Sequence, residues 1–268
     1  MEVLGTSHPV VRRLRRLARS ASERRTEGVF IAEGPDLVVA ALGANWPLEG
    51  IYVAQSALGH PRVAPVIENA PVTVVTDAAF ERMADAQSPQ GVLAACGLPT
   101  ISLDDVDSCG LTLALENVTD PGNVGTLVRS ADAWDARAVL LVGEGVDGYH
   151  PKVVRSSAGS IFRRPLLDSS LEAVETWCRF RSVTPWATTL RGGRDPRHAP
   201  LDGAVLVWIG SEARGLSESV LHSVTDCLSV PMASGVESLN AAIAGAVVMC
   251  EAFYQRSHSS HGAPPPSL

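Results

Sequence analysis

Short apolar runs alternate with helix-like segments along almost the whole 268-residue chain. In the second half the strand-like runs lie at 111–116, 138–142, 183–189, 204–209 and 227–230. Helical patterns fill 123–134, 150–159, 169–180, 217–225 and 238–255. Strands and helices that alternate in this way are typical of an α/β fold, because parallel strands need long crossover connections. The pattern therefore predicts an α/β domain with a mostly parallel sheet.

The first half repeats this alternation on a smaller scale. Its strand-like runs lie at 29–32, 51–54, 72–75 and 92–96, and its helical patterns at 7–21, 35–43, 60–69 and 77–85. A break follows at 98–108, where Pro99 and three aspartates interrupt the apolar pattern. We therefore expect a small N-terminal α/β domain over 1–98, a linker at 99–110 and a larger domain over 111–256. The Ser/Pro-rich residues 257–268 are expected to be a disordered tail.

A formal net charge of −7 hides a basic arm on an acidic body. Residues 1–25 hold seven arginines against two glutamates, a balance of +5, so that the rest of the chain carries −12. A segregated basic arm is typical of a chain that holds an anionic partner at one place. The same arginines could also form the solvated face of a helix, and the charge alone leaves both interpretations open.

The five cysteines are scattered and never form C-x-x-C, and the seven histidines are dispersed. A disulfide framework, a zinc ribbon or another metal site is therefore not expected, and a reducing cytoplasm is the simpler location. The longest apolar run, 241–250, is shorter than the roughly 20 residues that cross a bilayer. The first apolar run is broken by arginines, so we expect neither a signal peptide nor a membrane span.

Residues 143–148 match G-x-G-x-x-G between a strand-like run and a helical pattern, the setting of a dinucleotide-binding turn. Glu144 and Asp147, however, would lie where the pyrophosphate must bind, and His150-Pro151 interrupts the start of the helix. An acidic surface loop is the better interpretation. A dinucleotide-dependent oxidoreductase remains as a rival, which predicts NAD binding that is lost on Gly145→Asp.

The segment 117–132 joins a Pro-Gly turn to a helix that starts near Asn123. Apolar residues at helical spacing predict one buried face of this helix: Val124, Leu127, Val128 and Ala131. Arg129 lies off that face, with Gly125 one turn before it to admit a ligand. The arginine is suited to a phosphate or a developing oxyanion, although a solvated surface arginine explains it equally well.

Two further segments place polar residues beside apolar elements. At 205–217 an apolar run ends in G-x-E-x-x-G, where Glu212 would lie at the carboxyl end of a parallel strand, the usual place for ligands. At 230–240 Ser238 and Asn240 precede a helix that is apolar nearly all round. Such a helix is expected to be buried. One helix N-cap accounts for one of these two polar residues, not for both.

Together the three segments resemble motifs 1, 2 and 3 of the SpoU/TrmH-type RNA 2′-O-ribose methyltransferases of the SPOUT superfamily. They read N-x-x-D-P-G-N-x-G-x-x-x-R, G-x-E-x-x-G-L-S and P-M-x-x-x-x-E-S-L-N, in this order, and cover 111–255. The N-terminal part resembles the family's substrate-binding domain more weakly. That likeness rests on Arg24-Arg25, on 28–34 and on Gln90-Gly91.

The resemblance implies a trefoil-knotted, parallel-sheet SPOUT domain that follows a small L30e-like substrate-binding domain. It implies a homodimer that binds S-adenosylmethionine and needs no metal. The catalytic residues carried over are Asn123, Arg129, Glu212, Ser238 and Asn240. The cofactor-binding residues are Thr188, Thr189, Ile209, Gly210, Val230, Met232 and Leu239. The expected RNA-binding residues are Arg12, Arg13, Arg16, Arg24 and Arg25.

The family reaction is attack of a ribose 2′-oxygen on an electrophilic methyl group. A hydroxyl is a poor nucleophile, so its proton must leave or its developing charge must be stabilised. A guanidinium is hard to deprotonate, since its pKa lies above about 12. We therefore expect Arg129 to hold the phosphate and stabilise the nascent alkoxide, with Asn123 and Ser238 positioning Arg129 and the ribose. Glu212 is expected to orient motif 2 and the arginine.

This chain departs from the family pattern at three places, of which the two in motif 2 are conservative in size. Ser211 stands where asparagine is frequent, Ala213 where glycine is common, and Trp134-Asp135 where an aromatic-Gly pair usually ends the motif 1 helix. Asp135 can still stop the helix, because aspartate tolerates the left-handed conformation better than most residues.

The expected substrate is ribosomal RNA, because family members with this kind of N-terminal domain mostly modify ribosomal RNA. Transfer RNA, methylation that confers antibiotic resistance and a non-catalytic RNA-binding module remain as alternatives. Absence of S-adenosylmethionine binding would favour the non-catalytic module.

Overall fold

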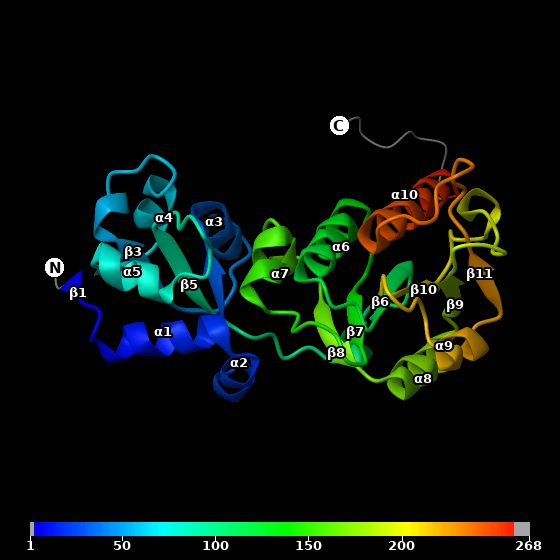
Figure 1. Ribbon diagram of the computed structural model, residues 1–268, viewed down its shortest axis with the longest axis horizontal. Helices are drawn as coiled ribbons and strands as arrows, with labels where there is room; N and C mark the ends of the chain where they lie inside the picture. The colour runs from blue at the N-terminus through cyan, green and yellow to red at the C-terminus, as the bar shows by residue number, and fades with distance from the viewer. Residues whose placement is uncertain (1–2, 260–268) are drawn as a thin grey trace. The chain divides into compact units, whose positions relative to one another are not determined.

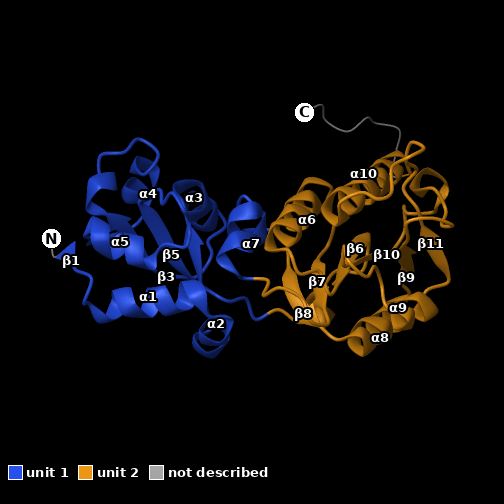
Figure 2. Cartoon of the chain, in the orientation of Figure 1, with its two compact units in different colours: residues 1–100, 149–163 blue, residues 101–148, 164–268 orange. Residues whose placement is uncertain are grey.

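The computed structural model describes residues 3–259 and contains two compact units (Figures 1 and 2). Unit 1 takes in the chain up to Thr100 together with Tyr149–Arg163. Unit 2 takes in Ile101–Gly148 and the chain from Arg164 onward. The segment Tyr149–Arg163, which sequence analysis assigned to the second domain, thus packs with the first half of the chain.

The sheet of unit 1 is mixed, with strand order β1-β4-β3-β5-β2. Its strands are β1 (Val3–Leu4), β2 (Val29–Glu33), β3 (Leu48–Ala54), β4 (Thr73–Val75) and β5 (Val92–Gly97). Its helices are α1 (Pro9–Arg19), α2 (Ala21–Glu27), α3 (Pro35–Gly43), α4 (Ala64–Asn69), α5 (Asp77–Met83) and α7 (Pro151–Ser156). Strand β5 runs antiparallel to both β2 and β3, so β5 begins where β2 and β3 end.

An aromatic cluster joins α7 and the turn after it to the rest of unit 1. The ring of Phe30 on β2 lies 4.8 Å from that of Tyr149, and the ring of Trp46 lies 5.3 Å from that of Phe162. Phe30 and Phe162 are buried. Contacts of this kind add about 0.5–1.5 kcal/mol to the burial of the rings. They explain why this segment packs with unit 1.

Unit 2 has a six-stranded sheet in the order β11-β9-β10-β6-β7-β8, and every pair is parallel. The strands are β6 (Leu111–Glu116), β7 (Val139–Val142), β8 (Leu166–Ser169), β9 (Thr184–Thr188), β10 (Val205–Gly210) and β11 (Asp226–Leu228). The helices are α6 (Pro121–Ala133), α8 (Leu171–Arg181), α9 (Glu218–Ser223) and α10 (Ala241–Ser259). The expected parallel α/β fold is confirmed, and β8 is an additional strand.

Helices α6 and α10 cover one face of this sheet, and α8 and α9 cover the other (Figure 1). A Cβ atom on Gly245 of α10 would lie 2.5 Å from the Leu127 side chain, so this glycine lets α10 pack closely on α6. On the opposite face Trp208, Trp177 and Val220 belong to one buried cluster. The sheet therefore holds the first turns of α6 and α10, which carry motif residues, on the same side.

Helix α10 is buried along only one side, which corrects the expectation of a helix buried all round. Ile243, Val247 and Tyr254 are 52%, 41% and 47% exposed, while Val248 and Met249 are fully buried. The helix continues through Ser259, so residues 257–259 are helical rather than tail. The rest of the expected tail, 260–268, lies outside the described residues. Among residues 3–259 we find no helix that is both long and apolar enough to span a membrane.

Candidate active site

The motif segments meet at the carboxyl edge of the unit 2 sheet, where the strand order reverses. From the central strand β6 the chain proceeds to β7 and β8 on one side, while β10, β9 and β11 lie on the other. The loops that follow the adjacent strands β6 and β10 therefore lead to opposite sides of the sheet. They leave a crevice between them, which is the usual ligand site of such sheets. A cavity of about 780 Å³ lies there, lined by residues of three loops: 117–119, 143–144 and 211–217.

Strands β9 and β10 separate just before this edge. Their pairing ends at Trp208 and Ala187, whereas β10 stays paired with β6 as far as Gly210 and Glu116. The Thr188 hydroxyl donates to the Trp208 carbonyl at 2.8 Å and so marks the point of separation. The main chain of Ile209-Gly210 therefore has no strand partner on the β9 side.

The loop after β10 folds back onto the strand it leaves. A Cβ atom on Gly210 would lie 2.3 Å from the Gly215 carbonyl carbon, so only glycine allows this approach. Gly215 has φ of +67°, and its N–H donates to the Ser211 carbonyl at 2.8 Å. The two glycines of G-x-E-x-x-G thus produce a tight loop with Glu212 at its exposed tip.

A buried carboxylate anchors that loop to β6. Glu116 is 6% exposed, and its two oxygens accept from the Ser217 N–H at 2.7 Å and the Ser217 hydroxyl at 2.6 Å. The Ser217 hydroxyl in turn accepts from the Val220 N–H and caps α9. Sequence reasoning missed Glu116, because this acidic residue ends an otherwise apolar strand. An acidic residue at the end of a buried strand was the available signal.

The G-x-G-x-x-G loop supports motif 1 rather than binding a dinucleotide. Asn117 has φ of +53°, and its Oδ1 accepts from the Glu144 N–H at 2.7 Å. A Cβ atom on Gly143 would lie 2.4 Å from that Oδ1, and the Val146 N–H donates to the Val118 carbonyl. Gly143 and Gly145 therefore let this loop lie close to the β6–α6 connection.

Three predicted catalytic residues, one from each motif, form a hydrogen-bonded chain. Asn123 lies in the first turn of α6, where its N–H donates to the capping carboxylate of Asp120 at 2.9 Å. The Asn123 Nδ2 donates to Glu212 Oε1, and Asn240 Nδ2 donates to Asn123 Oδ1 at 3.0 Å. Asn240 Oδ1 accepts from Ala242 N–H and Ile243 N–H, which makes it the N-cap of α10.

Arg129 and Ser238 stand outside this chain. Both are exposed, and within residues 3–259 no hydrogen bond or ion pair engages either side chain. Arg129 lies on α6, six residues beyond Asn123, opposite the buried face of Val128 and Ala131. Arg129 therefore lies off the core face, as the sequence predicted, with its guanidinium exposed to solvent.

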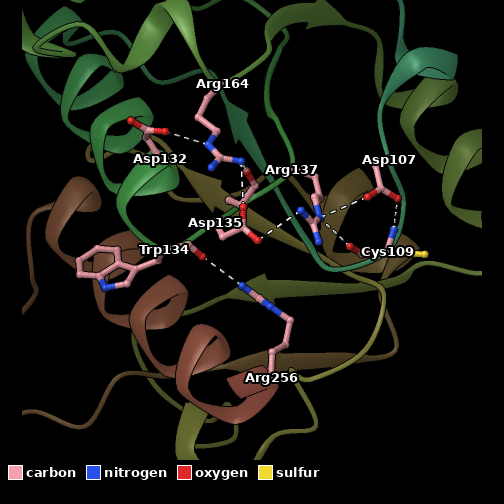
Figure 3. Close-up of polar contacts among 9 residues, drawn as sticks. Asp107, Cys109, Asp132, Trp134, Asp135, Arg137, Arg164 and Arg256 are labelled. Carbon is pink, nitrogen blue, oxygen red and sulfur yellow. Dashed lines mark hydrogen bonds and ion pairs between the residues drawn. The ribbon is translucent and has the colours of Figure 1, made fainter. Parts of the chain in front are cut away.

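Beyond the last turn of α6, paired charges fix the helix in place (Figure 3). Arg164 binds Asp132 and Asp135 at 3.0 Å each, and Arg137 binds Asp135 at 3.2 Å and the Cys109 carbonyl at 2.7 Å. Arg256 of α10 donates to the Trp134 carbonyl at 3.1 Å. Asp135 has φ of +50°, which confirms that aspartate ends this helix in the left-handed conformation.

The predicted cofactor residues lie at the ends of β9, β10 and β11 and in the segment that leads to α10. The Thr189 N–H donates to the Leu228 carbonyl at 2.8 Å, and its hydroxyl lies 3.1 Å from that of Ser229. A Cβ atom on Gly193 would lie 2.6 Å from the Leu228 carbonyl carbon, so this loop presses on β11. Thr188, Ile209 and Gly210 flank the separated strands. Val230, Met232 and Leu239 are half-buried in the following segment.

This arrangement fits the main-chain recognition expected for S-adenosylmethionine. On the side facing β9, the Ile209-Gly210 backbone has no strand partner and can offer main-chain groups, and Val230, Met232 and Leu239 offer apolar side chains. Within residues 3–259 no cluster of three or more metal-ligating side chains is present.

The predicted RNA-binding arginines of α1 and α2 fall into different environments. Arg12 and Arg25 are exposed, and Arg16 is 54% exposed beside Glu23 and Glu27. Arg13 binds both Glu27 and Glu49, which raise the pKa of its guanidinium, Glu49 having the larger effect.

Arg24 is the exception, and its assignment to RNA is corrected. It is 2% exposed, and its Nη1 donates to the Leu17 carbonyl at 2.5 Å and to the Ala18 carbonyl at 3.3 Å. These carbonyls belong to the last turn of α1, where they lack partners within the helix. Arg24 therefore closes the end of α1 and does not face solvent.

The fold and the site define a two-part α/β methyltransferase, with a substrate-binding unit before a parallel-sheet unit that carries the three motifs. The model of the MRM3-like substrate binding domain matches residues 8–94. The model of the SpoU rRNA Methylase family matches residues 110–250, and the chain belongs to this family. The family expected from the three motifs is thereby confirmed.

Similar proteins cover nearly the whole chain. A 23S rRNA (uridine(2479)-2′-O)-methyltransferase of Streptomyces viridochromogenes is 30% identical over 90% of this chain and 88% of its own length. The 23S rRNA (guanosine(2553)-2′-O)-methyltransferase RlmP of Bacillus subtilis is 28% identical over 85% of this chain and 89% of its own. The crystal structure of the SpoU methyltransferase AviRb from S. viridochromogenes with AdoMet superposes with a TM-score of 0.85 and 26% identity. That likeness covers 93% of this chain and 98% of AviRb.

Proposed function

We propose that this protein transfers a methyl group from S-adenosylmethionine to a ribose 2′-hydroxyl of ribosomal RNA in the cytoplasm. The observation that carries the proposal is the hydrogen-bonded chain of Glu212, Asn123 and Asn240, which joins the three motifs at the crevice. Arg129, on the same helix as Asn123 and without a partner among residues 3–259, supplies a free cation. Similarity to two 23S rRNA 2′-O-methyltransferases supports ribosomal RNA as the substrate class.

Bound S-adenosylmethionine supplies an electrophilic methyl group on a sulfonium centre. Thr188, Thr189, Ile209 and Gly210 would hold it from the ends of β9 and β10. Val230, Met232 and Leu239 would hold it from the segment before α10. Because β9 separates from β10 after Trp208, hydrogen bonds to main-chain groups of Ile209-Gly210 on the β9 side would cost no strand pairing.

Arg129 has the central chemical role in this proposal. Its guanidinium binds the phosphate next to the target ribose and stabilises negative charge that develops on the 2′-oxygen as the proton leaves. Asn123 and Ser238 orient the ribose and the arginine. Glu212 accepts a hydrogen bond from the Asn123 side chain and so holds the motif 2 loop against α6. Asn240 caps α10, and its Nδ2 also donates to the side-chain oxygen Oδ1 of Asn123.

The exposed side of α10 supports a homodimer. Ile243, Val247 and Tyr254 border a hollow of about 640 Å³ that Trp134 also lines. Large exposed apolar patches mark association surfaces. A second copy that covers this side would lie next to Asn240, the first residue before α10. The trefoil knot belongs to the same proposal, in which the segment before α10 passes through a loop of the chain.

Arg12, Arg13, Arg16 and Arg25 are proposed to contact RNA phosphates. Arg12 supports this most directly, because it is exposed and makes no ion pair within the described part of the chain. Arg13 and Arg16 would have to exchange glutamate partners for phosphates.

The test is methyl transfer by the purified protein to ribosomal RNA transcripts, followed by mapping of 2′-O-methyl groups. RNA from cells with and without the gene provides the matched comparison. We expect one ribosomal nucleotide that is methylated only in the presence of the gene. Methylation confined to transfer RNA would contradict the ribosomal substrate. Absence of S-adenosylmethionine binding by calorimetry would contradict the enzyme and leave an RNA-binding module.

A further inference from the structure

Unit 1 has a polar groove at the end of its sheet where β2, β3 and β4 finish and β5 begins. The groove consists of two adjoining hollows of about 340 and 430 Å³, and both are lined by Arg62 and Gln90. The smaller hollow also has Glu33, Ser88 and Arg155 in its wall, and the larger has Ser56, His60 and Asp77. We call these two hollows the unit 1 groove. Volumes of this size are those of small-molecule sites.

The walls of the groove are held by glycines that the sequence analysis singled out. Gly91 has φ of +75°, and a Cβ atom there would lie 2.4 Å from the Ala57 Cβ. Gly34 has φ of +118°, and its N–H donates to the Val92 carbonyl at 2.9 Å. The Gly91 carbonyl accepts from the Ala54 N–H at 2.8 Å. The groove is therefore shaped by backbone that is fixed before any ligand binds.

A buried, incompletely satisfied charge pair lies in the wall of the smaller hollow. The Glu33 side chain is 2% exposed, and its Oε2 accepts from the Asp85 N–H at 2.9 Å and the Ala86 N–H at 3.1 Å. Arg155 Nη1 lies 3.6 Å from the same oxygen. Glu33 Oε1 and Arg155 Nη1 are both buried and have no hydrogen-bond partner within residues 3–259. Buried charged groups are normally satisfied, so this incompletely satisfied pair marks the charged end of the groove wall.

The groups that face the groove suit a nucleobase with its phosphate. Gln90 is exposed, and within residues 3–259 no hydrogen bond engages its amide, which can both donate and accept. Arg62 is half-exposed at the junction of the hollows, where it holds Asp36 at 2.7 Å and can turn to a phosphate. Carboxylates nearby disfavour a bare anion, whereas the amino and imino groups of a base can donate to them.

We infer that the unit 1 groove binds an unpaired nucleotide of the RNA substrate, with the Gln90 amide on the edge of the base. The inference rests on the proposed function, because it assigns the substrate-binding unit a place of contact with RNA. Unpaired loop nucleotides expose the edges and faces that proteins read, whereas paired RNA hides them. The groove thus contributes to the choice of RNA sequence, separately from the methyl-transfer residues of unit 2.

The test compares Gln90→Ala with Gln87→Ala, a matched control because Gln87 is an exposed glutamine of the same loop that does not line the groove. We expect Gln90→Ala to raise KM for ribosomal RNA at least fivefold, with kcat, S-adenosylmethionine affinity and melting temperature as in the wild type. Gln87→Ala should match the wild type in all four. Equal KM values for the two variants would overturn the inference.

Direct contact is tested by ultraviolet crosslinking of RNA substituted with 4-thiouridine. We expect crosslinked peptides from the 84–91 loop, and crosslinks only elsewhere would also overturn the inference. RNA binding measured by filter retention separates the two proposals. If the wild type binds RNA without methylating it, the proposed function fails, and weaker binding by Gln90→Ala would still support the groove. If the wild type binds no RNA, both fail.

Discussion

The arginines around α6 occupy two contrasting environments. Beyond the end of the helix, Arg137 and Arg164 each engage at least one carboxylate and one main-chain carbonyl. On the helix itself, Arg129 is exposed and meets no partner within residues 3–259. Sequence alone does not separate these two kinds of arginine. Their environments do, because the protein already satisfies Arg137 and Arg164, whereas Arg129 stays open to solvent, the state that its proposed role requires.

The largest expected effect is that of Arg129→Ala on the rate of methyl transfer, with the stability of the fold unchanged. Arg129→Ala should lower the rate of methyl transfer by about 10²–10³-fold, as when a group that stabilises transition-state charge is removed. The free energy of unfolding should change by less than about 0.5 kcal/mol, because the side chain is exposed. Initial rates and urea unfolding measure the two quantities.

Arg129→Lys sharpens the same prediction. A lysine keeps the charge and loses the planar fork, so we expect a rate well below the wild type. A rate near that of the wild type would contradict two-point contact between Arg129 and the substrate.

A smaller loss of methyl-transfer rate, about tenfold, is expected when a negative charge is placed among the hydrogen-bonded residues Glu212, Asn123 and Asn240. Asn123→Asp puts a carboxylate where the Asn123 amide now donates to Glu212. Repulsion between the carboxylates should displace the motif 2 loop and slow methyl transfer. Initial rates measure the effect, and adding Glu212→Gln to Asn123→Asp removes the repulsion, so part of the lost rate should return. A double variant as slow as Asn123→Asp would count against this explanation.

Substitution of Arg164 is expected to lower the stability of the protein and leave methyl transfer unchanged, the reverse of what is expected for Arg129. Its side chain is 22% exposed and holds Asp132, Asp135 and the Ala136 carbonyl. Arg164→Ala should therefore destabilise the protein by about 1–3 kcal/mol, a partly solvated case of a broken ion pair. Methyl transfer per folded molecule should stay near the wild-type value. Arg179→Ala, at an exposed position on α8, is the control and should leave unfolding unchanged.

The smallest effects separate two arginines near the N-terminus. Arg12→Ala should weaken RNA binding a few-fold, with stability unchanged. The slope of the logarithm of the binding constant against the logarithm of the salt concentration should become shallower by about one. Arg24→Ala should instead destabilise the protein, because the last carbonyls of α1 lose their donor. Filter binding at several salt concentrations and thermal unfolding check both. A salt slope unaltered in Arg12→Ala would remove Arg12 from the RNA-contacting set.

Much of the fold of unit 2 was predictable because its parallel strands are continuous apolar runs separated by helical periodicity. Strand β8 was missed, since only Leu166 and Leu167 mark it in a segment that begins with arginines and proline. The place of Tyr149–Arg163 in unit 1 could not be predicted, because aromatic contacts with Phe30 and Trp46 decide it. Periodicity shows that a helix has an apolar face but does not show which sheet covers that face.

The candidate site was predictable as a set of residues and not as a geometry. The motifs named Asn123, Glu212 and Asn240, and the structure adds the hydrogen bonds that join them. The anchoring role of Glu116 depends on Ser217, which lies 101 residues away, and its place at the end of an apolar run was a signal without a partner. The burial of Arg24 depends on how α2 turns back onto the end of α1, which the spacing of charged residues does not show.

The passage of the chain through unit 1 for a second time, at Tyr149–Arg163, has a consequence for dissecting the protein. No single cut can release the two units, because a fragment that ends near residue 100 leaves α7 and the aromatic residues Tyr149 and Phe162 behind. The fragment would expose the Phe30 face of β2 to water and should be prone to aggregation. Grafting this substrate-binding unit onto another methyltransferase therefore requires two exchanged segments. Natural recombination with one crossover point would meet the same obstacle.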